Sequence, residues 1–236
     1  MVQVAAARQH GPFLTMLSLT PEQWGELGQG ALTTLGLTVF SLAVGFGLAL
    51  LGALGRRSGN PLARAVAGTY VEALRNTPFF VQLLFLFFGL PTLGVQLTEL
   101  QAAALAMTLN LGAYATEIVR AGLDAVPRGQ VEAAASLGLS RAQTFWTVVL
   151  RQALAVVYPA LVSQVIIVML GSAVVSYINV KDLTYAAQFI ASRNFQQFGL
   201  YLVVTAAYLA LAFALRAALN GVGRSLFRFK QPLRAA

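Results

Sequence analysis

Polar residues with the clearest potential for chemistry lie together inside one long apolar stretch. Asn110, Tyr114 and Glu117 follow one another at spacings of four and three, so on a helix they occupy a single face. They offer an amide, a phenol and a carboxylate, which suit the amino, carboxylate and polar side-chain groups of a small solute. The alternatives are structural: Glu117 pairs with Arg120 one turn later, and Asn110 hydrogen-bonds one helix to another.

Further polar residues would extend such a path through other apolar parts of the chain. Thr77 precedes Pro78, where a helix is expected to start, and Gln82 follows one turn into that helix. Gln164 and Ser172 are separated by eight positions and share roughly one helical face. Helix capping and close helix packing are the competing explanations for these residues.

Several kinds of site are excluded by the sequence. The chain has no cysteine, which removes disulfides, thiolate metal sites and cysteine catalysis. It also lacks a G-x-x-x-x-G-K-[ST] phosphate loop, so it does not hold a nucleotide in that manner. We therefore expect no catalytic residue, metal or cofactor in this chain.

The composition indicates which elements must position these residues. Hydrophobic residues make up 58% of the chain and charged residues only 10%, with a mean hydropathy of +0.72. Soluble domains carry about 25% charged residues, so this chain is expected to face lipid. The net charge of +8 does not indicate nucleic acid, because the basic residues fall in short loops and not on a hydrated basic face.

Five stretches are long enough to cross a membrane, which takes about 20 mostly apolar residues. They have no alternation of period two, so a closed barrel is not expected. The sequence predicts an all-α polytopic membrane protein with about five spans, at residues 30–55, 77–95, 100–119, 152–177 and 198–219.

The distribution of basic residues predicts the orientation and the division of the chain. Most Lys and Arg fall in the links 56–75 and 120–151 and in the tail 220–236, which are expected to be cytoplasmic. Residues 1–29 then form an external N-terminal segment. In it, Thr20-Pro21-Glu22-Gln23 predicts a capping box that starts either a short interfacial helix or an ordinary polar lead-in. Residues 30–219 form the membrane domain.

The cytoplasmic loop 120–151 has an unusual local pattern. Residues 131–137 are strong helix formers, and Gly138 is placed to end that helix in a left-handed conformation. Ser140-Arg141-Ala142-Gln143 is a second capping box that starts a new helix. The loop therefore predicts a helix, a sharp turn and a second helix. It either connects two spans or passes a push from a soluble partner to span four.

Residue identity favours the second explanation. Glu132-Ala133-Ala134, then Gly138, then Val148-Val149-Leu150 resembles the EAA signature of permease subunits of ABC importers. Arg151 stands where that signature usually has proline. The resemblance implies that Glu132, Ala133, Ala134 and Gly138 couple the chain to a separate ATPase.

The resemblance extends over residues 30–219 and is closest to polar amino-acid permeases of the histidine, glutamate, glutamine and arginine type. Residues 70–82 are similar to their segment leading into span two, with Asn76 in place of the usual glycine. Residues 110–122 are similar to their third span. Residues 170–174 lack the lysine that usually follows span four.

The resemblance implies a type I ABC importer fold like that of the methionine importer, in a bacterial inner membrane. It also implies an ATPase dimer that binds ATP and Mg, a second permease subunit, an external solute-binding protein and a small polar amino acid as substrate. The alternatives are an ion-driven secondary transporter, which should carry acidic or histidine residues at mid-span, and a channel subunit without an ATPase.

Overall fold

The computed structural model describes residues 19–194 and 197–227, in which helices are joined by short turns and no strand occurs. Residues 1–18 of the expected external segment and 228–236 of the expected tail lie outside the described part. Four helical segments are long and apolar enough to cross a membrane, and a bent pair of helices raises the number to five. The prediction of an all-α protein with about five spans is therefore confirmed.

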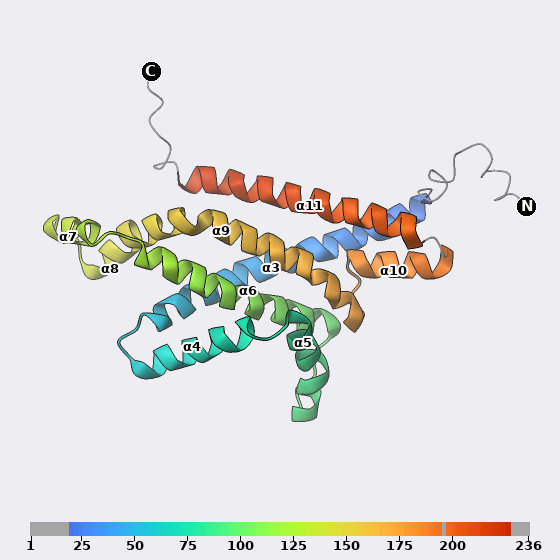
Figure 1. Ribbon diagram of the computed structural model, residues 1–236, viewed down its shortest axis with the longest axis horizontal. Helices are drawn as coiled ribbons and strands as arrows, with labels where there is room; N and C mark the ends of the chain where they lie inside the picture. The colour runs from blue at the N-terminus through green and yellow to red at the C-terminus, as the bar shows by residue number, and fades with distance from the viewer. Residues whose placement is uncertain (1–18, 195–196, 228–236) are drawn as a thin grey trace, which may run out of the picture.

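Four long helical segments run side by side along the longest axis of the molecule (Figure 1). Helices α7 and α8 lie at one end of this bundle, and α10 lies at the other end (Figure 1). The segments are α3 (Pro21–Arg56), α6 (Glu99–Asp124), the run of helix from Arg141 to Ile178 that contains α9, and α11 (Gln197–Leu226).

Helix α3 begins at the predicted capping box. The Thr20 hydroxyl accepts a hydrogen bond from the Gln23 N–H, and the Gln23 side chain accepts one from the Thr20 N–H. No proline interrupts the chain after Pro21, so the helix continues without a break to Arg56. A separate interfacial helix before the first span was therefore the wrong expectation: those residues are the first turns of α3.

The second predicted span, 77–95, is not one straight helix. Helix α4 (Pro61–Arg75) precedes it, and α5 (Phe79–Leu84) begins the run Phe79–Leu93, which is bent by 109° relative to α4. Pro78 causes the break, because it cannot donate a backbone hydrogen bond and disfavours a helical conformation at the residue before it. A π-helix, η1 (Phe85–Gly89), and a 3-10 helix, η2 (Leu90–Leu93), continue α5 as far as Gly94.

The fourth predicted span starts earlier than residue 152. Its helix begins at the Ser140 capping box as α8 (Arg141–Gln143), passes through the π-helix η3 (Thr144–Val149) and becomes α9 (Leu150–Gly171). It ends in a 3-10 helix, η4 (Ser172–Ile178). The helix runs through Arg151 without interruption.

One element was not expected from the sequence. Helix α10 (Leu183–Asn194) fills the link between the last two spans and packs with α3 and α11. Asp182 lies at its start and is fully buried. Its Oδ1 accepts a hydrogen bond from the Tyr185 N–H at 2.8 Å, and its Oδ2 accepts one from the Tyr208 hydroxyl at 3.2 Å.

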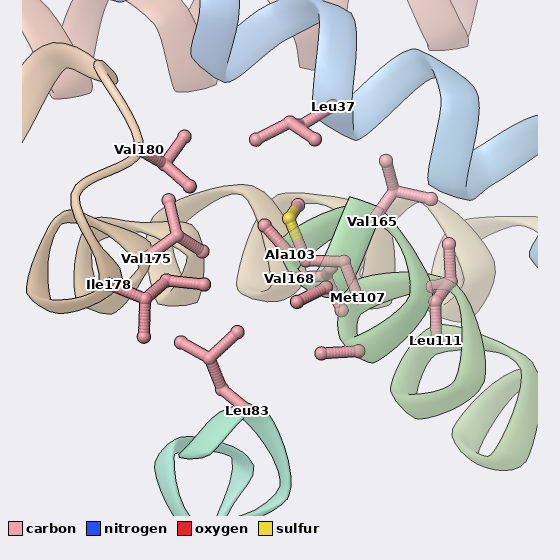
Figure 2. Packing of buried hydrophobic residues seen from close by; sticks show 12 residues of the cluster. Leu37, Leu83, Ala103, Met107, Leu111, Val165, Val168, Val175, Ile178 and Val180 are labelled. Atoms are coloured by element: carbon pink, nitrogen blue, oxygen red, sulfur yellow. The ribbon is translucent and has the colours of Figure 1, made fainter. Parts of the chain in front are cut away.

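The largest apolar cluster joins five helical elements of the described chain. Leu37 of α3, Leu83 of α5, Met107 of α6 and Val165 of α9 converge there, together with Val175 of η4 (Figure 2). Leu83 and Met107 are fully buried, so this cluster fixes α5 against the long helices. The break between α4 and α5 is thereby held beside the middle of α6.

Candidate functional site

A cavity of about 320 Å³ opens at the break between α4 and α5. Its polar lining comes from three parts of the chain: Thr77 at the break, Asn110 and Tyr114 on α6, and Gln164 on α9. The structure therefore brings together four of the seven residues that the sequence proposed for a solute path. The rest of the lining is mainly apolar and consists of Pro78, Phe79, Ile167, Val168 and Gly171.

Gln82 lies behind the cavity wall and is buried. Its Nε2 donates to the carbonyl oxygens of Leu74 and Thr77 and to the Thr77 hydroxyl, at 2.7, 3.0 and 2.9 Å. Its Oε1 accepts a hydrogen bond from Asn110 Nδ2 at 3.1 Å. Gln82 thus donates hydrogen bonds to backbone carbonyl oxygens beside the helix break, and it holds the Asn110 amide in one orientation.

Asn110 and Tyr114 present different groups to the cavity. Because Asn110 uses its Nδ2 on Gln82, its Oδ1 is left to accept a hydrogen bond; no donor to it occurs within residues 19–194 and 197–227. The Tyr114 ring lies under the guanidinium of Arg75, 5.3 Å from ring centroid to Cζ. The Tyr114 hydroxyl lies 3.4 Å from the Arg75 carbonyl oxygen.

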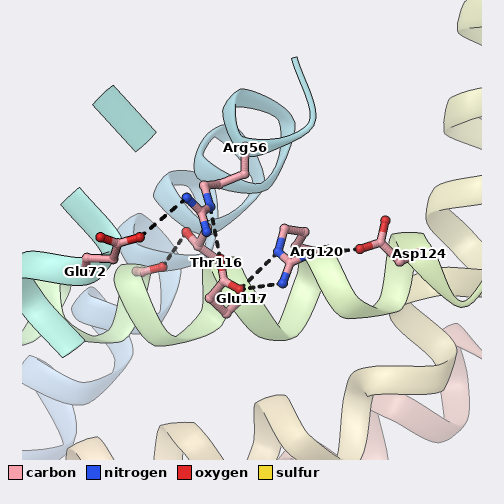
Figure 3. A network of polar contacts seen from close by, with 7 residues as sticks. Arg56, Glu72, Thr116, Glu117, Arg120 and Asp124 are labelled. Atoms are coloured by element: carbon pink, nitrogen blue, oxygen red, sulfur yellow. Dashed lines mark hydrogen bonds and ion pairs between the residues drawn. The ribbon is translucent and has the colours of Figure 1, made fainter. Parts of the chain in front are cut away.

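Glu117 is not part of the cavity lining. It lies one turn beyond Tyr114 and is held between two arginines (Figure 3). Its Oε2 accepts hydrogen bonds from Arg120 at 2.8 and 3.0 Å, and its Oε1 lies 3.3 Å from Arg56 Nε. The alternative explanation from the sequence, pairing with Arg120, is therefore correct, and Arg56 is a second partner that the sequence did not indicate.

The ion pairs extend on both sides of Glu117. Arg56 also lies 3.9 Å from Glu72 of α4, and Arg120 pairs with Asp124 at 3.0 Å (Figure 3). Arg57 reaches the same Asp124 at 3.5 Å. This charged cluster, which consists of Arg56, Arg57, Glu72, Glu117, Arg120 and Asp124, ties the end of α3 to α4 and α6.

Ser172 also lies outside the cavity. Its side chain is fully buried, and its hydroxyl donates to the Met169 carbonyl oxygen at 2.7 Å. The chain is α-helical from Leu150 to Gly171 and turns about 100° per residue, so eight positions place Ser172 about 80° from Gln164 around the helix axis. The helical face that contains Gln164 therefore does not continue to Ser172.

The loop after α6 has the predicted helix–turn–helix form. Helix α7 (Arg128–Ser136) ends at Gly138, whose φ of +78° is the left-handed conformation expected there. The N–H of Leu139 donates to the Ala134 carbonyl oxygen and that of Gly138 to the Ala135 carbonyl oxygen, a Schellman motif. The second capping box, at Ser140, is present as predicted.

The four residues assigned to coupling, in α7 and in the turn after it, differ in accessibility. Glu132, Ala133 and Gly138 are exposed, whereas Ala134 is 3% exposed and packs against its own chain. A partner that docks on α7 therefore reaches the exposed side that carries Glu132. In the described part of the chain, no group of three or more metal-ligating residues occurs.

Comparison with known proteins identifies the family of this chain. Residues 41–228 match the family described as the inner membrane component of binding-protein-dependent transport systems. The chain belongs to this family. It is 35% identical over 214 residues to a probable amino-acid ABC transporter permease of Sinorhizobium fredii, covering 87% of this chain and 89% of that one. It is 36% identical over 207 residues to the L-cystine permease TcyB of Bacillus subtilis, covering 87% and 88%.

Solved structures agree with this assignment. A crystal structure of an amino acid ABC transporter with histidines superposes with a TM-score of 0.80 at 33% identity, covering 92% of this chain and 99% of that chain. An inward-facing structure of the MetNI methionine ABC transporter gives a TM-score of 0.74 at 22% identity, covering 88% and 99%, which shows a shared fold. The protein is thus a multi-pass amino-acid ABC permease with the fold expected from its sequence.

Proposed function

We propose that this permease subunit carries a small polar amino acid through the cavity at the α4–α5 break, by alternating access. The observation that carries the proposal is the cavity's neutral polar lining, Thr77, Asn110, Tyr114 and Gln164, inside an otherwise apolar wall. Broken helices frame the substrate sites of many transporters, because the freed backbone and polar groups can face a solute there. Relatives named for amino acids and for L-cystine support the same substrate class.

The lining also favours a solute without net charge. Glu117 and Arg56 form an ion pair with each other, and the Arg75 guanidinium stacks on the Tyr114 ring. A zwitterionic amino acid with a polar side chain brings donors and acceptors that match the amides and hydroxyls of the cavity. A strongly charged solute would meet no opposite charge among the lining residues.

ATP is hydrolysed by a separate subunit in this proposal, because the chain has no phosphate loop of its own. The proposed assembly lies in a bacterial inner membrane and contains an ATPase dimer that binds ATP and Mg, a second permease subunit and an external binding protein. The N-terminus is outside, and the loop with α7 is cytoplasmic. Support comes from the basic residues beside α7 and from its exposed Glu132.

Reconstitution of the chain with its ATPase in liposomes tests the coupling. We expect ATP-dependent uptake that is lost in Glu132→Arg, since a reversed charge on the exposed side of α7 opposes docking. Glu22→Arg, an exposed site at the far end of α3, is the matched control and should transport normally.

A second pair of variants tests the turn after α7. Gly138→Val places a β-branched residue at φ +78°, at a cost of about 1–2 kcal/mol, whereas Gly138→Asn tolerates this conformation. Uptake should fall in the first variant and persist in the second. If Glu132→Arg and Gly138→Val both assemble and transport like the native chain, the coupling role of this loop is refuted.

A further inference from the structure

A second and larger cavity, of about 580 Å³, lies between α7 and the C-terminal ends of α3 and α6. Leu54 and Leu123 line it from the ends of α3 and α6, and Val131 and Phe145 line it from α7 and η3. Nothing in the transport path described above uses this cavity. Its lining is apolar apart from three arginines and Thr144.

The three arginines come from three separate elements. Arg57 directly follows the last residue of α3, Arg128 begins α7, and Arg141 begins α8. Arg57 lies 3.5 Å from Asp124, a carboxylate that already pairs with Arg120. Arg128 and Arg141 are exposed, and no carboxylate in the described part of the chain forms an ion pair with either.

The position of this cavity matches the surface of a membrane. The long apolar helices α3 and α6 end beside it, and α7 and α8 lie beyond those ends (Figure 1). Trp146 follows Phe145 in η3, is 57% exposed and contacts the Phe145 ring edge to face at 5.4 Å. Tryptophan at such a position is typical of the interface between lipid and water.

We propose that this cavity binds an anionic phospholipid of the leaflet at this end of the helices. Guanidinium groups pair with phosphate through charge-assisted hydrogen bonds, and three separate elements each contribute an arginine to the lining. The apolar wall matches the glycerol and the first acyl carbons below the phosphate. A bound lipid would join α7 to the ends of α3 and α6, so the position of the coupling loop would depend on lipid composition.

Tryptophan fluorescence of the full chain provides the test. The sequence has two tryptophans, so Trp24→Phe leaves Trp146 as the only reporter. This chain is reconstituted in phosphatidylcholine that contains a minor fraction of brominated phosphatidylglycerol, or the same fraction of brominated phosphatidylcholine. Trp146 should be quenched at a lower fraction of the anionic lipid than of the zwitterionic lipid.

Charge-removing variants distinguish a site from general attraction. Replacing Arg128 and Arg141 by Gln should raise the fraction of brominated phosphatidylglycerol needed for half-maximal quenching, by roughly fivefold for each arginine. Arg64→Gln, an exposed arginine of α4 outside the cavity, is the matched control and should leave the fraction unchanged.

Three results would overturn the proposal. The first is equal quenching by the two brominated lipids, and the second is an equal effect of Arg64→Gln and the double variant. The third is a double variant that weakens ATPase binding while the quenching stays the same, since the arginines would then serve an acidic protein surface. Each of these leaves the transport proposal intact, because uptake through the first cavity is measured separately.

Discussion

The solute cavity and the charged cluster are built on the same helix, yet they are different kinds of environment. Asn110 and Tyr114 of α6 face a neutral cavity, whereas Glu117, one turn later, is held between Arg56 and Arg120. The difference is decided by the neighbours, since the break before α5 lies beside the first two residues and the end of α3 lies beside the third. A shared helical face is therefore not sufficient to make a shared site.

The largest expected effect is a loss of stability when the charged cluster, and not the solute cavity, is changed. Glu117→Gln leaves Arg56 and Arg120 without their shared carboxylate, and the loss of both half-buried pairs together costs about 3 kcal/mol. The thermal unfolding midpoint of the purified chain in detergent should fall clearly. Glu22→Gln, an exposed glutamate, should change the midpoint little. An unchanged midpoint in Glu117→Gln would mean that the cluster does not hold α3 and α6 together.

Asp182 sharpens the comparison, because it is a buried carboxylate without an arginine partner. Burial raises its pKa to about 6, and its hydrogen bonds from Tyr185 and Tyr208 offset this only in part. At Asp182, the folded state therefore holds a proton more often than the unfolded state between pH about 4 and 6. The contribution of Asp182 to the free energy of unfolding should fall as pH rises through that interval, by roughly 3 kcal/mol, and level off above it.

Asp182→Asn provides the check on this pH dependence. Unfolding midpoints measured from pH 4 to 7 should lose this decline in the variant, while Glu117→Gln should keep it. An identical pH profile in the native chain and in Asp182→Asn would show that Asp182 titrates at its ordinary value.

The smallest effect is expected at the edge of the charged cluster. Arg57 and Asp124 are 41% and 47% exposed, and exposed ion pairs contribute about 0–1 kcal/mol. Arg57→Gln should therefore lower the unfolding midpoint far less than Arg56→Gln, at the adjacent position, which contacts Glu117 and Glu72. Equal losses in the two variants would mean that exposure does not distinguish these pairs.

Local signals in the sequence predicted much of the fold. The capping boxes at Thr20 and Ser140 and the left-handed Gly138 are each determined by a few adjacent residues, and all three are present. The apolar stretches predicted the spans because each can meet lipid only as a helix. Helix ends were less predictable, since α3 and the helix that contains α9 extend well past the apolar stretches.

The candidate site was predictable only in part. The start of a helix at Pro78 was predicted, whereas helix α4 before it was not, because residues 61–75 are too polar to suggest a span. The contact between Arg56 and Glu117 joins residues far apart in the sequence, so no local pattern could reveal it. Ser172 was assigned to the path because two residues eight positions apart were taken to share a face, although on an α-helix they lie about 80° apart.

The most direct test of the account is amino-acid uptake by proteoliposomes that contain the assembled transporter with Asn110→Leu. This change removes the amide from the cavity, and we expect roughly tenfold slower uptake, which corresponds to one lost hydrogen bond. Asn220→Leu, an exposed asparagine of α11, is the control and should transport normally. Uptake at the native rate in Asn110→Leu, with assembly intact, would contradict the claim that the solute passes through this cavity.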